Sequence, residues 1–405
     1  MADSECRRMS KRNAEIILGI DFGTSYSSAA AIINGEIQWV LDRGDAMIPS
    51  VVHLPKTGAP LVGVEAQVRL ATHPNTTIQS IKRILGRRLE DRDVRLLDAG
   101  VGYQIIAGPR GKAALKIGGQ TYACEQIAAA ILTYLRDIAE RRFGSRIRKV
   151  IIAVPAESSP SFISALRRAA RVAHLELLQV IPEPIAGALS LGLHGNACNR
   201  RIAVCDFGGG TFDATLIEQE GLQFTPVACH GNTLLGGDDF DDILAEEVAN
   251  SVQRRCGFNM RNDVVRWHHL RMRCESAKRI LSREEEATLK MPDAYIEQGQ
   301  QRNIDLLLDR NWAEAKWKPL IVQMNAVLAR LLETSQWLPS DVQEVVLIGG
   351  TSLIPMVRKN IADFFEREEV TSNEFANVAV AYGATLQTAG HLAISTELPS
   401  LTLAS

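Results

Sequence analysis

The same short phrase occurs twice in this chain, nearly half its length apart. Asp21-Phe-Gly-Thr24 and Asp206-Phe-Gly-Gly-Gly-Thr211 each follow an apolar strand candidate and precede a second one. Glycine lets a strand turn tightly and brings backbone N–H groups close to a ligand, and such amides form a nest suited to anions. A repeat on this scale predicts two related lobes rather than a solenoid, whose period would be about 20–50 residues.

Strand and helix patterns alternate along the chain, which favours an α/β fold. One helix is predicted from Ile127, Ile131, Leu135 and Ile138, which fall on a single face. The predicted strands are residues 16–20, 29–33, 149–154, 177–181, 201–205, 214–218 and 342–348. The predicted helices are residues 126–142, 161–173, 184–193 and 377–389.

These patterns predict a domain organisation with two lobes and two insertions. The 405 residues exceed what one hydrophobic core supports, which is about 250–300 residues. The expected segments are a disordered tail (1–15), lobe I (16–196) with an insertion at about 51–125, lobe II (197–372) with an insertion at about 238–312, a C-terminal helix returning to lobe I (373–394) and a tail (395–405).

Composition excludes several classes of function. A net charge of −2 argues against a nucleic-acid partner. The seven cysteines are odd in number and no two have C-x-x-C spacing, which indicates reduced thiols rather than a disulfide framework. The apolar run at residues 16–18 is too short for a signal sequence or a membrane span. We therefore expect a cytoplasmic protein with no membrane partner.

The repeated phrase has a chemistry of its own. An aspartate at a strand end, beside a glycine nest, suits Mg²⁺ held through water, since Mg²⁺ favours carboxylates and keeps several waters. The threonine that follows adds a hydroxyl group. Two such hairpins facing across a cleft could hold a triphosphate from both sides. The chain has no G-x-x-x-x-G-K-[ST] motif, so it is not a P-loop enzyme.

Three motifs carry a resemblance to a known family. Gly19-Ile-Asp-Phe-Gly-Thr-Ser-Tyr-Ser27, Asp206-Phe-Gly-Gly-Gly-Thr-Phe-Asp213 and Gly349-Gly-Thr-Ser352 resemble the two phosphate motifs and the adenosine motif of the 70-kilodalton heat-shock chaperones. Further landmarks follow in the family's order: Ile81-Lys-Arg-Ile-Leu-Gly86, Val154-Pro155, Glu183-Pro184, Leu235-Gly-Gly-Asp-Asp-Phe-Asp241, Cys274-Glu-Ser-Ala-Lys-Arg-Ile-Leu-Ser282 and Ala379-Val-Ala-Tyr-Gly-Ala384. The likeness covers residues 16–392 and includes no substrate-binding domain.

The resemblance implies a role for each matching residue. Asp21 and Asp206 would hold Mg²⁺ through water, Lys82 would neutralise developing charge and orient the attacking water, and Glu183 would help to position that water. The implied catalytic set is Lys82, Glu183, Asp21, Asp206, Thr24, Thr211 and Asp213. The implied nucleotide-binding set is Gly23, Thr24, Ser25, Tyr26, Gly208, Gly209, Gly210, Thr211, Gly236, Gly237, Glu275, Lys278, Arg279, Ser282, Gly349, Gly350, Thr351 and Leu353.

The same resemblance implies a fold and an activity. Members of the actin, hexokinase and heat-shock ATPase superfamily have two lobes with ribonuclease-H-like sheets and inserted subdomains around a central nucleotide cleft. We therefore expect ATP or ADP with Mg²⁺ (K⁺ is compatible), slow hydrolysis of ATP to ADP and phosphate, and action as a nucleotide switch. The expected partners are a client protein or a separate substrate-binding chain, and the expected state is a monomer.

Other classes of function stay open at this point. One is a nucleotide-binding interaction module with little or no turnover. Another is an actin-like filament protein, against which the stretch from Leu235 to Asp241 argues. A third is a small-molecule kinase, for which no convincing catalytic carboxylate facing an acceptor site is found. Zinc bound by Cys256, His268, His269 and Cys274 is disfavoured, because their spacing is not a common finger pattern.

Several positions depart from the family's pattern. Pro182 replaces an asparagine before the Glu-Pro pair, Leu353 replaces an arginine that covers one face of adenine, and Asn377 replaces an aspartate. Other departures fall at positions that relay the nucleotide state or engage J-domain co-chaperones, namely Glu157, Ser158, Ile163 and Gln179. These changes motivate the interaction-module alternative.

Two of the proposed catalytic residues also have a plainer interpretation. Lys82 lies in a charge-rich run, which is usually a solvated helix face. Glu183 could be only a carboxylate at a helix N-terminus, where the macrodipole favours it. In both cases the match to the family motif favours the catalytic role, while Arg83 beside Lys82 stays undecided.

Overall fold

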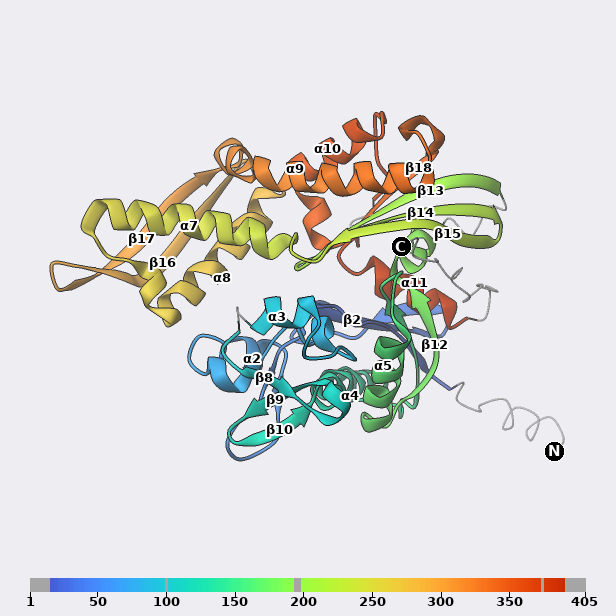
Figure 1. Cartoon of the computed structure of the whole chain (residues 1–405), viewed down its shortest axis with the longest axis horizontal. Helices are drawn as coiled ribbons and strands as arrows, with labels where there is room; N and C mark the ends of the chain where they lie inside the picture. The colour runs from blue at the N-terminus through green and yellow to red at the C-terminus, as the bar shows by residue number, and fades with distance from the viewer. Residues whose placement is uncertain (1–14, 99–100, 193–197, 373–374, 390–405) are drawn as a thin grey trace, which may run out of the picture.

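The computed structural model describes residues 15–98, 101–192, 198–372 and 375–389, and Figure 1 shows them as two lobes. Residues 1–14 of the predicted N-terminal tail, residues 390–394 of the predicted C-terminal helix segment and the tail at 395–405 lie outside the described residues. Each lobe is built on one mixed sheet.

The N-terminal half of the chain forms the first sheet. Its strands are β1 (Ile17–Asp21), β2 (Tyr26–Ile33), β3 (Glu36–Trp39), β4 (Ile48–Pro49), β11 (Lys149–Val154) and β12 (Glu176–Pro182). The order is β12-β11-β1-β2-β3, with β4 paired to β2. β1, β11 and β12 run parallel, whereas β2 is antiparallel to both β1 and β3. Asp21 therefore lies at the carboxyl end of the parallel strands, opposite Ala153.

The second sheet repeats this order. Its strands are β13 (Cys198–Phe207), β14 (Phe212–Gly221), β15 (Gln223–Asn232) and β18 (Glu344–Ile348). The order is β15-β14-β13-β18, with β13 and β18 parallel and the other pairs antiparallel. A parallel bridge between Val346 and Thr371 takes the place of a fifth strand. The duplicated ribonuclease-H-like arrangement and the α/β fold class predicted from the sequence are confirmed.

Smaller elements fill the two predicted insertions. In the first half they are β5 (Val52–His53), β6 (Leu61–Val62), α2 (Val64–Gln67), η1 (Pro74–Thr76), β7 (Thr77–Ile78), η2 (Ile81–Ile84), α3 (Arg92–Asp98), β8 (Gln104–Ala107), η3 (Pro109–Gly111), β9 (Ala113–Ile117) and β10 (Gln120–Ala123). In the second half they are α7 (Gly237–Cys256), η5 (Met260–Asn262), α8 (Val264–Leu281), β16 (Glu286–Glu297) and β17 (Gln300–Asp309), which project sideways from the second sheet in Figure 1.

The remaining helices pack on or between the sheets. They are α4 (Cys124–Phe143), α5 (Pro160–Val172), α6 (Glu183–Ser190), α9 (Arg310–Ser335), η6 (Pro339–Asp341), η7 (Gly350–Leu353), α10 (Pro355–Phe364) and α11 (Ala379–Gln387). Local sequence sets their ends: the Ser159 hydroxyl accepts from the Phe162 amide at 3.2 Å to cap α5, and α4 ends where Gly144 adopts φ 64°.

Each lobe has its own core, and a third core joins them. In lobe I it surrounds α4, where Ile127, Ile131, Leu135 and Ile138 are buried as their periodicity predicts. In lobe II it surrounds α7, α8 and α9. The joining core draws on both sheets and on α6 and α11, with Ile151, Ile185, Val204, Ile348 and Val380 among its members. The two lobes therefore share one apolar contact, centred on these two helices.

Most predicted elements are present, with corrections at their ends. Residues 342–343, predicted as strand, precede β18, and the predicted C-terminal helix is shorter at both ends than residues 377–389. β15 was not predicted, because its sequence, Gln-Phe-Thr-Pro-Val-Ala-Cys-His-Gly-Asn, contains a proline and a glycine that weaken the strand signal. The boundaries of lobes and insertions stay a prediction.

The crossing of α6 and α11 leads to a test of stability. A Cβ added to Gly383 would lie 1.8 Å from the carbonyl oxygen of Ala186, so the helix backbones would have to separate. We expect Gly383→Ala to lower the free energy of unfolding by about 1–3 kcal/mol. Gly144→Ala is the control, because nothing lies within 4 Å of its added Cβ and only its positive φ opposes the change. Urea unfolding of both variants measures the difference, and equal losses would contradict the close crossing.

Candidate functional site

The two repeated phrases face each other between the lobes. The loop after β1 carries Thr24 and Ser25, and the loop after β13 carries Gly209 and Gly210. An added Cβ on Gly209 would lie 2.8 Å from the Ser25 hydroxyl oxygen, and one on Gly210 would lie 3.4 Å from the Thr24 methyl carbon. The structure therefore brings together two loops that are far apart in the sequence.

On the lobe II side of this site, backbone segments from three glycine motifs pack closely against one another. Gly236 approaches the loop after β13 so closely that an added Cβ would lie 2.4 Å from the carbonyl oxygen of Gly209. Gly349 has φ +81°, and its added Cβ would lie 2.4 Å from the carbonyl oxygen of Phe207. Thr351 donates its hydroxyl to the carbonyl oxygen of Gly208 at 2.8 Å. These contacts bring the three predicted glycine motifs of this lobe into one cluster.

An ion pair spans the lobe I side. Lys82 lies on η2, and its ammonium nitrogen is 2.6 Å from Glu183 Oε1. Glu183 begins α6, directly after β12. The two side chains are only 11% and 13% exposed, so this is not the solvated helix face that the charge-rich run around Lys82 would favour. Burial lowers the pKa of Lys82, but Glu183 and Asp21 outweigh it and raise that pKa above its usual value.

Three aspartates share this site with the ion pair. Burial raises the pKa of Asp21 to about 7, with Glu183 adding to the rise and Lys82 opposing it. Burial also raises the pKa of Asp213 to about 6 and that of Asp206 well above its usual range. Asp206 and Asp213 lie opposite each other on β13 and β14. The site therefore gathers more negative charge than its one lysine balances.

The predicted adenosine residues lie on α8 at the other end of the site. Glu275 accepts a hydrogen bond from the Tyr26 hydroxyl at 2.7 Å and pairs with Arg279 at 2.8 Å. The Arg279 guanidinium lies over the aromatic ring of Tyr26, with its central carbon 5.3 Å from the ring centre. Lys278 is buried and pairs with Asp241 at 2.7 Å. Tyr26 thus connects lobe I with lobe II at the edge of this cavity.

Three adjoining cavities form one cleft. The adenosine side is a cavity of about 480 Å³ whose walls include Glu275, Arg279, Ser282 and Leu353. A narrow cavity of about 100 Å³ follows, lined by the two phosphate loops and both magnesium candidates. An outer cavity of about 490 Å³ continues beyond Lys82. The neighbouring cavities share lining residues, namely Tyr26, Met47, Gly209, Gly350 and Asn377 on one side and Thr24, Lys82, Glu183, Gly210 and Thr211 on the other.

Some residues of the cleft were missed or undecided in the sequence. Arg83 donates to the carbonyl oxygen of Gly210 at 2.7 Å and so connects the two lobes. In the sequence, only the position of Arg83 next to Lys82 indicated that it could belong to the site. Met47 and Asp238 line the cleft as well, and Met47 has no motif that could have identified it.

The departures from the family pattern fall at different distances from the cleft. Leu353 and Asn377 line the adenosine cavity, and Glu157 and Ser158 line the outer one. Gln179 lies on β12, where its side-chain oxygen accepts from Gln387 at 3.3 Å. Among the described residues, no group of three or more His, Cys, Asp or Glu could hold a metal ion directly, so no zinc site forms at the cysteines and histidines of α7 and α8.

The comparisons with known proteins agree with this geometry. The family described as "Hsp70 protein" matches residues 17–397. The chaperone protein DnaK of Buchnera aphidicola subsp. Schizaphis graminum (strain Sg) is 33% identical over 380 residues, which are 92% of this chain and 59% of that protein. The chain therefore spans less than two thirds of the length of this curated relative.

The duplicated sheets and the cleft between them define the two-lobed fold of the Hsp70 and actin-like ATPases. The family match covers most of the chain, and the DnaK relative extends over nearly all of it. The chain belongs to the Hsp70 family. Within the part of the chain that the structure describes, no helix is both long and apolar enough to cross a membrane.

The raised pKa values lead to a prediction about pH. In the folded chain the pKa of Asp21 is about 7, compared with its usual 3.8. The protonated side chain therefore favours folding. This contribution to stability is complete below about pH 4 and is lost as the pH rises through about 7. Without divalent cations, we expect Asp21→Asn to stabilise the protein by about 1–3 kcal/mol at pH 8 and by less at pH 5. Urea unfolding in EDTA measures both values.

Asp305→Asn is the matched control for this experiment. Its side chain is 66% exposed and its nearest cation is 3.8 Å away, so the change should have little effect at either pH. A gain for Asp21→Asn that is no larger at pH 8 than at pH 5 would contradict the electrostatic description of the site.

Proposed function

We propose that this chain binds ATP with Mg²⁺ in the cleft and hydrolyses it slowly to ADP and phosphate. The observation that carries the proposal is the buried Lys82–Glu183 pair, at 2.6 Å, beside the junction of the two facing glycine loops. Phosphoryl transfer depends mainly on positioning and on electrostatic stabilisation, and this junction supplies backbone amides, hydroxyl groups and a fixed ammonium group.

The residues present fit a magnesium ion. Asp21 and Asp206 lie at the ends of β1 and β13, where burial raises the pKa of both carboxyl groups and Lys82 only partly opposes the rise. Direct coordination by three or more carboxylates is not available among the described residues, whereas Mg²⁺ commonly binds through one or two carboxylates and retained water. When bound, Mg²⁺ would offset the charge of the triphosphate and align it.

Each side chain of the junction has a distinct task in this proposal. Lys82 stabilises the charge that develops on the phosphoryl oxygens, and Glu183 holds both that ammonium group and the attacking water. Thr24 and Thr211 offer hydroxyl groups from opposite lobes. Asp213, at the edge of the outer cavity, accepts hydrogen bonds from water there. The glycines at positions 23, 208, 209, 210, 236, 237, 349 and 350 let the backbone approach the phosphates.

On the adenosine side, polar groups of α8 would hold the nucleoside. Glu275, Lys278 and Ser282 face the ribose and the base in this proposal. The guanidinium group of Arg279 lies over the Tyr26 ring in the structure. In this proposal it would leave that ring and stack on one face of adenine. Leu353 would pack against the other face, where the family's arginine is absent.

The wider role that we propose is a nucleotide switch acting on a client or partner protein in the cytoplasm. α6 carries Glu183 at its first residue and crosses α11 closely, so the site of hydrolysis is directly attached to the contact between the lobes. All six cysteines among the described residues are unpaired, which supports a reducing compartment.

A second function has a specific observation in its favour. Glu157 and Ser158 line the outer cavity where the family's pattern has aromatic residues, and this change leaves the nucleotide groups in place. The chain would then bind nucleotide as an interaction module with little turnover. Single-turnover hydrolysis distinguishes the two, because only the first function consumes bound ATP.

The proposed task of Lys82 gives a test of the mechanism. We expect Lys82→Ala to reduce single-turnover ATP hydrolysis by about 100-fold or more while ATP affinity changes by much less, because the ammonium group acts mainly in the transition state. Arg88→Ala is the control, since Arg88 is exposed and pairs only with Glu90 and neighbouring residues. Turnover by Lys82→Ala at the rate of the control would refute the assignment.

Leu353 gives a separate test of the adenosine site. We expect Leu353→Arg to tighten ATP and ADP binding by about three- to tenfold, because a guanidinium group stacks on a base more favourably than an alkyl chain. Isothermal titration with both nucleotides measures the change, and Leu353→Met serves as the control without a charge. Unchanged affinity for both nucleotides would place the base elsewhere in the cleft.

A further inference from the structure

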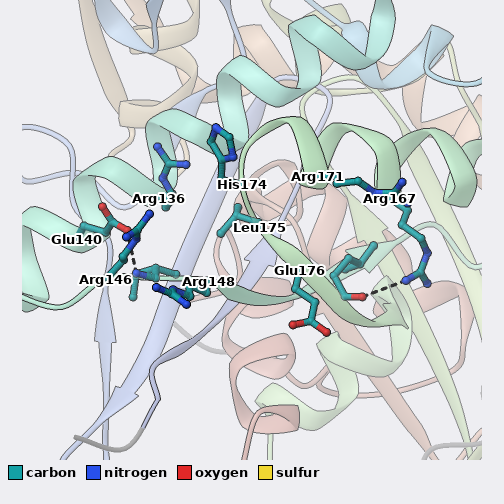
Figure 2. A pocket seen from close by; sticks show the side chains of 11 residues that line it. Arg136, Glu140, Arg146, Arg148, Arg167, Arg171, His174, Leu175 and Glu176 are labelled. Atoms are coloured by element: carbon teal, nitrogen blue, oxygen red, sulfur yellow. Dashed lines mark hydrogen bonds between the residues drawn. The ribbon is translucent and has the colours of Figure 1, made fainter.

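A second concave site lies in lobe I, away from the nucleotide cleft. It is a cavity of about 720 Å³, shown in Figure 2 and called here the arginine basin. The helices α4 and α5 and the starts of β11 and β12 surround it. Its lining residues are Arg136, Glu140, Arg146, Ile147, Arg148, Arg167, Arg171, His174, Leu175, Glu176 and Leu177.

We propose that the arginine basin binds an acidic segment of a partner protein. Five arginines and no lysine line it, against two glutamates. Arginine presents a planar fork of N–H donors that matches carboxylates in two-point contacts, which a lysine ammonium cannot do. The composition of the basin therefore fits carboxylate recognition better than a general positive surface.

Three of the five guanidinium groups are available to a ligand. The side chains of Arg146, Arg148 and Arg171 are exposed and make no hydrogen bond or ion pair with other described residues. The other two are held in place: Arg136 pairs with Asp137 at 2.6 Å, and Arg167 donates to the carbonyl oxygen of Leu177 at 3.1 Å. Like charges gathered without partners repel one another, and an anionic occupant relieves that repulsion.

The arginines form two groups, which indicates an extended occupant. Figure 2 shows Arg136, Arg146 and Arg148 on one side and Arg167 and Arg171 on the other, with Leu175 and Glu176 between them. The carboxylate of Glu176 would repel a compact polyphosphate centred in the basin. A peptide with acidic residues at two separated points can contact both arginine groups and keep its own charges away from Glu176.

The basin belongs to a different part of lobe I from the nucleotide cleft. β11 and β12 begin at the basin with Lys149 and Glu176, and they end at the cleft just before Pro155 and Glu183. The N-terminal segment 1–14 of this chain does not match the basin, because it carries four basic residues and only two acidic ones. The proposal therefore assigns the complementary charge to a partner protein.

The test uses the full chain and a short fluorescein-labelled peptide in which two pairs of glutamates flank a short uncharged spacer. We expect saturable binding by fluorescence anisotropy that weakens as salt is raised, since screening acts on exposed charges. Arg146→Glu/Arg171→Glu, with one change in each arginine group, should weaken binding by about tenfold or more. ATP binding should stay unchanged, because neither residue lines the cleft.

Arg254→Glu/Lys318→Glu is the matched control, because it makes the same change in net charge at exposed positions outside the basin. The proposal requires this control to bind the peptide like the unmodified chain. Arg146→Gln/Arg171→Gln repeats the test if the charge-reversed variant does not fold. Equal weakening in basin and control variants would overturn the proposal. So would binding of tripolyphosphate or single-stranded DNA at the basin in place of the peptide.

Discussion

The electrostatic balance around Lys82 is the constraint on which the nucleotide site depends. Asp21, Asp206, Asp213 and Glu183 come from four different elements and surround one ammonium group. Partly buried carboxylates at such density resist ionisation, so they remain together only because two rigid sheets and α6 hold their backbones in place. The duplicated fold therefore holds together carboxyl groups that would otherwise repel one another, and under the proposed function a magnesium ion with its nucleotide would offset their charge.

The sequence predicted the fold class, and most of the catalytic residues that it proposed line one cavity, because their signals are local. Asp21 and Asp206 end apolar strands and precede glycine turns, and Lys82 and Glu183 belong to short motifs in a known order. Other features depend on contacts between distant segments. The arrangement of Arg279 over Tyr26 joins residues 253 positions apart by number, from 26 to 279, and no spacing rule relates them. The arginine basin has the same character, since α4, α5 and two strand ends contribute to it and none carries a motif.

The departures from the family pattern follow a spatial order that the sequence alone did not show. Leu353 and Asn377 adjoin the adenosine cavity, while Glu157 and Ser158 adjoin the outer cavity beyond the phosphate loops. The junction of the two glycine loops, with its lysine and carboxylates, lies between these changed regions. These four changes therefore affect what surrounds the triphosphate position at either end. Pro182 is a further change that directly precedes Glu183, and the groups proposed to act on the phosphates are retained.

The close crossing of α6 and α11 has a mechanical consequence. Because Gly383 meets the backbone of Ala186 without an intervening side chain, this part of the molecule resists separation more than it resists rotation. If one lobe turned against the other about this crossing, the displacement of a residue would grow in proportion to its distance from the crossing. The hairpin β16–β17 lies at the far end of lobe II in Figure 1, a long way from this crossing. A rotation too small to disturb the shared core would therefore move this hairpin farther than the residues beside the core.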